Sequence, residues 1–121
     1  MTTIISRLEE GLSAGKFAFE SPCYIYDPEQ LKNNILALEE SVGTPVILSI
    51  KANPGVDLNL RLTDRQAGVE VASLKELNLV ANSGKIYINN PSMDKNLMRA
   101  GIAAKACFII DSQQQLQQLI T

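Results

Sequence analysis

The stretch VILSIKANP, residues 46–54, decides the fold predicted for this chain. It begins with apolar, mostly β-branched side chains, which are typical of a buried strand. Lys51 ends the apolar run, and Pro54 prevents the strand from continuing. A lysine at that point lies at the end of the sheet, and lysine forms Schiff bases with aldehyde cofactors. By position alone, Lys51 is either such a lysine or an ordinary solvated charge.

Three more short apolar segments follow, so that strands are predicted at residues 45–50, 68–72, 85–88 and 106–110. Segments with helical periodicity lie between and after them, at residues 56–62, 74–80, 93–102 and 116–120. The spacing of about 20 residues is that of compact βα units. This alternation predicts parallel strands with right-handed crossovers, and the near-continuous apolar runs predict strands covered on both faces.

The predicted fold class is therefore α/β, with about four βα units. Four units can form a small open sheet or the first half of an eight-stranded barrel. A complete barrel needs about 250 residues, so 121 residues do not close one alone.

The first residues differ from this repeating pattern. Residues 4–12 predict a short amphipathic helix that ends at Gly15, and residues 23–26 predict a short strand. Asp27 is the expected cap of a second helix whose first residue is Pro28. The apolar residues of that helix fall on one face, which we expect to be buried: Leu31, Ile35, Leu38 and Val42.

Composition excludes several classes of function. The net charge of −2 and the scarcity of aromatic residues argue against nucleic acid and anionic membranes as partners. No apolar run approaches a membrane span, and no signal-like segment precedes residue 15, so we expect a cytoplasmic protein. The chain has no histidine, which excludes histidine-based catalytic sites and histidine zinc sites, and we expect no metal.

Polar residues stand at the end of every predicted strand, where parallel α/β folds bind ligands. They are Lys51, Asn53, Glu70, Ser73, Glu76, Asn89, Asn90, Asp111 and Ser112. Local roles compete with binding roles for most of them. Ser73, Asp111 and Ser112 suit helix N-caps, Ser73 with Glu76 has the spacing of a capping box, and Asn90 with Pro91 suits a turn. Glu70 lies either on a solvated face or at a barrel mouth near Lys51.

Five blocks together resemble the fold-type III pyridoxal-phosphate-dependent decarboxylases, the diaminopimelate, ornithine and arginine decarboxylases. Residues 50–54, IKANP, resemble the family's VKANP segment. Residues 22–27 resemble its TPFYVYD entry, and residues 68–77 resemble GFDVAS followed by EL. Residues 89–95 resemble its ANPGK region, and residues 108–112 resemble FVVDS. The blocks occur in the family's order across residues 22–119.

The resemblance implies the first half of an alanine-racemase-like TIM barrel. Residues 1–27 would be the segment that joins the family's β-domain, and residues 28–121 a partial barrel that binds pyridoxal 5'-phosphate. Lys51 matches the lysine that forms the Schiff base with this cofactor, and Glu70 and Asn90 match positions near it. Ser73, Glu76 and Asn53 match the surrounding pocket. The implied reaction is release of carbon dioxide from an L-amino acid.

The family's phosphate loop, its pyridine-binding glutamate and its stacking histidine match no residue of this chain, nor do the second barrel half and the β-domain. We therefore expect the chain to be an N-terminal fragment with little activity of its own, which need not bind the cofactor. A half barrel exposes strand edges, so we also expect a homodimer or other self-association. The alternatives are a pyridoxal-phosphate-dependent racemase or cofactor-homeostasis barrel, and a non-catalytic α/β module. Residues 51–56, KANPGV, lack the KANAYGHG motif of racemases, which favours a decarboxylase.

Overall fold

The computed structural model describes residues 3–16, 18–19, 22, 25–52, 68–80 and 84–121, which form two compact units, Met1–Ala37 and Leu38–Thr121. Three sequence predictions fall wholly or partly outside the described residues. They concern the strand at residues 23–26, the helix at residues 56–62 and the site residue Asn53.

The two N-terminal helices begin at the residues that the sequence predicts, Ile4 and Pro28. Helix α1 covers Ile4–Ser13 and is followed by Gly15, which has a φ of 65° that favours glycine. Helix α2 covers Pro28–Val42. The Asp27 carboxylate accepts hydrogen bonds from the backbone N–H groups of Glu29 and Gln30, so Asp27 is the N-cap, and it also pairs with Arg7.

The expected burial of one face of α2 is wrong. No residue of this helix is buried, and Leu38 and Val42 are 50% and 55% exposed. The spacing of apolar residues identifies the face that a neighbour would cover, but it does not supply the neighbour. The described residues leave this face open.

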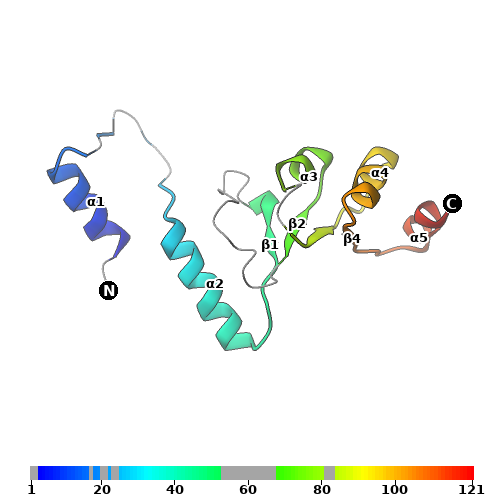
Figure 1. Ribbon diagram of the computed structural model, residues 1–121, viewed down its shortest axis with the longest axis horizontal. Coiled ribbons are helices and arrows are strands. Elements are labelled where there is room, and N and C mark those ends of the chain that lie inside the picture. Colours follow the sequence, from blue (N-terminus) through cyan, green and yellow to red (C-terminus); the bar gives the residue numbers. More distant parts are fainter. Residues whose placement is uncertain (1–2, 17, 20–21, 23–24, 53–67, 81–83) are drawn as a thin grey trace. The chain divides into compact units, whose positions relative to one another are not determined.

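The second unit is built on a sheet of four parallel strands in the order β1-β2-β3-β4 (Figure 1). The strands are β1 Leu48–Ser49, β2 Val69–Val71, β3 Ile86–Ile88 and β4 Cys107–Phe108. Each strand lies inside its predicted segment, so the α/β class and the parallel arrangement are confirmed. The strand order has no reversal, whereas a doubly wound sheet has one at its switch point. The order is compatible with part of an α/β barrel.

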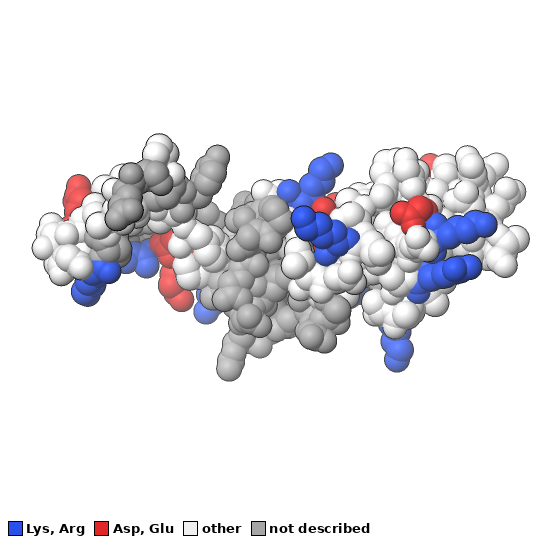
Figure 2. Space-filling view, turned by 90° about the horizontal axis from the view of Figure 1, so that it is seen from above, with Lys and Arg blue, Asp and Glu red and all other residues white. Residues whose placement is uncertain are grey.

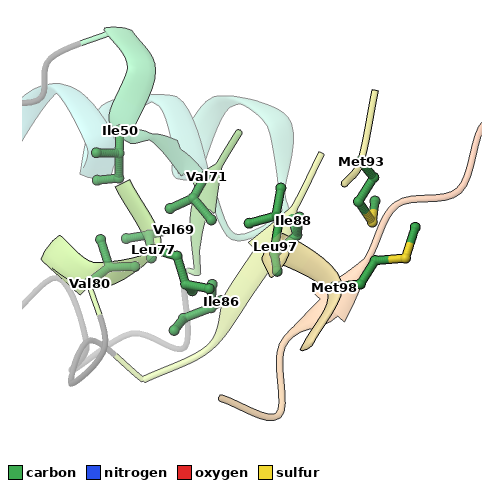
Figure 3. Close-up of a cluster of buried hydrophobic side chains, with 10 residues drawn as sticks. All are labelled: Ile50, Val69, Val71, Leu77, Val80, Ile86, Ile88, Met93, Leu97 and Met98. Carbon is green, nitrogen blue, oxygen red and sulfur yellow. The ribbon is translucent and has the colours of Figure 1, made fainter. Parts of the chain in front are cut away.

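Three helices connect or follow the strands: α3 Leu74–Val80, α4 Lys95–Ala103 and α5 Gln113–Ile120. Helices α3 and α4 lie beside each other over the sheet (Figure 1). The core lies between these helices and one face of the sheet, where Val69, Val71, Ile86 and Ile88 meet Leu77, Val80 and Leu97 (Figure 3). Burying side chains of this size stabilises the fold by about 1.5–3 kcal/mol each.

The opposite face of the sheet differs from the prediction of strands covered on both faces. Residues alternate between the faces of a strand, so Glu70 and Tyr87 point away from the helices while their neighbours in β2 and β3 are buried. Glu70 is in register with Ser49 on β1 and with Tyr87 on β3, and Tyr87 is in register with Cys107 on β4. We call this row Ser49, Glu70, Tyr87 and Cys107 the open face. Its members are half-buried or exposed because the described helices pack on the other side.

Among the described residues, no helix combines the length and the apolar character that crossing a membrane requires.

Candidate functional site

Lys51 lies just beyond the end of β1, within a single 3₁₀ turn, η1 Ile50–Ala52. The two neighbours in this turn have different environments: Ile50 is 1% exposed in the core, whereas Lys51 is exposed. The buried isoleucine anchors the turn and leaves the lysine amine accessible. No hydrogen bond or ion pair joins Lys51 to any other residue in the described part of the chain.

Glu70 occupies the middle of β2 on the open face and is half-buried. Its register partner on β1 is Ser49, and Lys51 follows Ser49 by two residues. A carboxylate and an amine therefore come from adjacent strands near one end of the sheet. The described residues provide Glu70 with no hydrogen-bonding partner of its own.

Ser73 and Glu76 form a capping arrangement at the start of α3. The Ser73 hydroxyl accepts a hydrogen bond from the Glu76 N–H (3.2 Å), and the Glu76 carboxylate accepts one from the Ala72 N–H (2.7 Å). This is the structural alternative that their spacing predicted. Both side chains are half-buried, and these bonds hold the carboxylate against its own backbone.

Asn90 links the ends of β2 and β3. Its amide nitrogen donates to the Ala72 carbonyl (2.7 Å), and its amide oxygen accepts from the Ser92 N–H (2.8 Å), which makes the predicted turn. Ala72 is therefore held from both sides, by Glu76 at its N–H and by Asn90 at its carbonyl. Three of the predicted site residues, Ser73, Glu76 and Asn90, are therefore brought together around Ala72.

Gln115 extends these links to β4, and sequence analysis did not identify it. It is 4% exposed, and its amide nitrogen donates to the carbonyls of Asn90 and Pro91 (3.0 and 2.9 Å). Its amide oxygen accepts from the Asp111 N–H (3.1 Å). Ser112 is the N-cap of α5, whereas Asp111 contributes only its backbone there, so the prediction of a cap at Asp111 is wrong. The signal for Gln115 was its position three residues after Ser112, the same spacing as Glu76 after Ser73.

Tyr87 is a second residue that the sequence patterns did not identify, and it lies on the open face. Its ring covers Gly68, where a Cβ atom would lie 2.4 Å from the ring, and the Lys85 amine lies 5.2 Å from the ring centroid. A side-chain hydrogen bond with Tyr87 raises the pKa of Lys85 above its usual value. Lys85, the residue before β3, therefore has its ammonium group over an aromatic ring.

The described residues contain no other cluster of charged or metal-binding side chains. No group of acidic or cysteine side chains in the described ranges could hold a metal ion. Lys and Arg side chains are interspersed with Asp and Glu on the surface seen in Figure 2. Cys107 is a free, exposed thiol at the end of the open-face row.

This arrangement offers one chemical group for reaction with a ligand, the accessible amine of Lys51. Ser73, Glu76, Asn90 and Gln115 use their polar atoms to connect the strand ends to one another. They stabilise the carboxyl end of the sheet, from which Lys51 projects. Asn53 lies outside the described residues.

Comparison with known proteins gives one relative. The chain is 25% identical to a diaminopimelate decarboxylase from Deinococcus radiodurans, in an alignment of 103 residues that covers 81% of this chain and 27% of the relative. The chain thus spans about a quarter of the length of that protein. No protein-family model and no solved structure matches the chain.

Proposed function

We propose that this chain corresponds to the N-terminal part of a pyridoxal 5'-phosphate-dependent amino-acid decarboxylase, with Lys51 as the residue that attaches the cofactor. The observation that carries the proposal is an exposed lysine at the carboxyl end of β1, in a parallel sheet whose strand order suits a barrel. The similarity to a diaminopimelate decarboxylase supports it. In this proposal residues 28–121 are the first βα units of the barrel.

The described residues at the carboxyl end of the sheet fit one part of the cofactor, its aldehyde group. Lys51 supplies an accessible amine, which is what an aldehyde requires. The phosphate group has a weaker fit. The N-termini of α3, α4 and α5, which lie at this end of the sheet, are already capped by Ser73, Asp94 and Ser112. We infer that the phosphate is held by residues other than these, and that cofactor affinity of the chain alone is low.

The roles of the chain's own residues follow from their positions. Lys51 would bind the cofactor and move a proton at Nζ, and the Glu70 carboxylate lies on the adjacent strand, in register with Ser49. Asn90, Ser73 and Glu76 keep the ends of β2 and β3 in register around Ala72. The cofactor, when bound, accepts the electrons released as carbon dioxide leaves the substrate. The proposed substrate class is an L-amino acid, and the proposed location is the cytoplasm.

The test is covalent labelling at Lys51. The chain is mixed with pyridoxal 5'-phosphate and treated with borohydride, which makes any bond between the cofactor and a lysine permanent, and the labelled lysine is identified by mass spectrometry. We expect preferential labelling of Lys51. A matched comparison uses Lys51→Ala and Lys75→Ala, because Lys75 is also exposed but lies on α3.

The two variants separate specific attachment from general amine reactivity. Loss of most labelling in Lys51→Ala, with wild-type labelling in Lys75→Ala, supports the proposal. Equal labelling of many lysines, or labelling that survives in Lys51→Ala, overturns it and leaves the chain as a non-catalytic α/β module.

A further inference from the structure

Exposed apolar side chains lie at both edges of the sheet, and others lie on the central helices α3 and α4, where Leu74, Leu79 and Ile102 are 39%, 52% and 59% exposed. On the β1 side, Ile47 is 43% exposed, and Leu38 and Val42 at the end of the preceding helix are 50% and 55% exposed. On the β4 side, Ile109, Leu116 and Ile120 are 39%, 49% and 74% exposed. The central strands β2 and β3, in contrast, contribute Val69, Val71, Ile86 and Ile88 to the core.

Both sheet edges also carry backbone groups that pair with no strand among the described residues. The Leu48 N–H bonds inward to Gly68, and the Ile109 N–H bonds inward to Ile88. Successive residues of a strand direct their N–H and C=O groups to opposite sides, so those of Ser49 on β1 and Phe108 on β4 point away from the sheet. No other described strand pairs with either edge.

We propose that two copies of this chain associate through these edges and form a closed barrel of two four-stranded halves. In this dimer, β4 of each copy pairs with β1 of the other, and the open face becomes the interior. The inference rests on the strand order and does not depend on the chemistry of Lys51.

Several features favour a second copy as the occupant. The four strands run in one direction and in sequential order, so a two-fold axis along the barrel keeps every strand parallel. Eight strands are the number that an interior filled with side chains requires. Pairing β4 with β1 satisfies both edges at once, whereas any pairing of like edges leaves two others free.

The helices fit the same arrangement. Helix α5 follows β4, and the residues around Leu38 and Val42 precede β1, with the Val46 N–H bonded to the Glu39 side chain (3.0 Å). When β4 meets the partner's β1, the two exposed apolar helix faces come to the same junction. Their burial together explains why each is amphipathic yet uncovered in a single copy.

The test is the mass of the 121-residue chain in solution, measured by sedimentation velocity and light scattering across micromolar concentrations. We expect a dimer of twice the 13.2 kDa chain mass. Ile120→Lys, on edge helix α5, should raise the dimer dissociation constant about tenfold or more. Ile102→Lys is the matched control, because Ile102 is 59% exposed on the central helix α4, and it should leave the dissociation constant within about threefold.

A second measurement distinguishes a closed barrel from other dimers. The chain has one other cysteine, Cys23, which a Cys23→Ser background removes. In this background, the reaction of the exposed Cys107 with a thiol reagent should slow about tenfold as chain concentration rises and β4 becomes paired. A monomer at all concentrations, open-ended polymers, a dimer that only Ile102→Lys disrupts, or a dimer with unchanged Cys107 reactivity would each overturn the proposal. None of these outcomes bears on labelling at Lys51.

Discussion

Gly101 shows how a single residue determines the packing of a helix on the sheet. It is buried near the C-terminal end of α4, and glycine inside a helix weakens it by about 1 kcal/mol relative to alanine. A Cβ atom at this position would lie 2.4 Å from Ile88 Cδ1 and 2.6 Å from Phe108 Cζ. The helix therefore approaches β3 and β4 at a distance that only glycine allows.

Gly101→Ala should destabilise the fold by about 1–3 kcal/mol, because overpacking outweighs the gain in helix propensity. Ile88→Val removes the Cδ1 atom and should recover part of this loss, with a coupling free energy of about 0.5 kcal/mol or more in a double-mutant cycle. Ile86→Val provides the control, since Ile86 is also buried but is not among the atoms nearest to this glycine. Urea denaturation of the single and double variants measures these values. Equal coupling for both isoleucines would contradict the explanation.

At the level of elements, the same capping arrangement occurs at two strand ends. Ser73 and Glu76 bind the backbone at the start of α3, and Ser112 and Gln115 do so at the start of α5. In each, the third helical residue accepts a hydrogen bond from the N–H of the residue before the serine. Glutamate and glutamine are therefore equivalent as acceptors here, although glutamine alone can also donate to the carbonyls of Asn90 and Pro91, which follow β3.

Replacing Glu76 tests whether its hydrogen bond or its charge stabilises the fold. Glu76→Gln keeps an acceptor for the Ala72 N–H and should change the free energy of unfolding by less than about 0.5 kcal/mol. Glu76→Ala leaves that half-buried N–H without its partner and should cost about 1–3 kcal/mol. Thermal and urea unfolding measure both. A large loss in Glu76→Gln would show that the charge itself, and not the hydrogen bond, matters at this position.

The capping serines and the strand segments could be predicted because they depend on neighbours in sequence. Asp27 with Pro28, and Ser73 with Glu76, follow local spacing rules. The links from Asn90 to Ala72 and from Gln115 to Asn90 join residues 18 and 25 positions apart. Such contacts depend on strand register and order, which a local pattern does not contain.

For the molecule as a whole, the apolar faces of α2 and α5 are the main difference between prediction and structure. Leu116 and Ile120 are exposed, and the buried residue of α5 is Gln115. Leu119 packs against the core only in part. The proposed second copy would cover these faces.

Association of folded chains should make thermal stability depend on concentration. If the dimer is the folded form, a tenfold increase in chain concentration should raise the Tm by a few degrees, because binding of the partner stabilises the native state. Ile120→Lys should reduce this dependence, whereas Ile102→Lys should retain it. Calorimetry or circular dichroism at several concentrations measures the effect, and a Tm independent of concentration in the wild type would contradict it.

The sequence by itself determined the four strands of the sheet, the helix caps at Asp27, Ser73 and Ser112, and the position of Lys51 just after β1. These features depend on local periodicity and on residues a few positions apart. The tertiary structure decided which face of the sheet the helices cover and that Glu70 and Tyr87 lie on the open one. It also decided that Asn90 and Gln115 connect strand ends. These features depend on strand order and on which surfaces meet, and packing across the sheet settles both only after the local elements have formed.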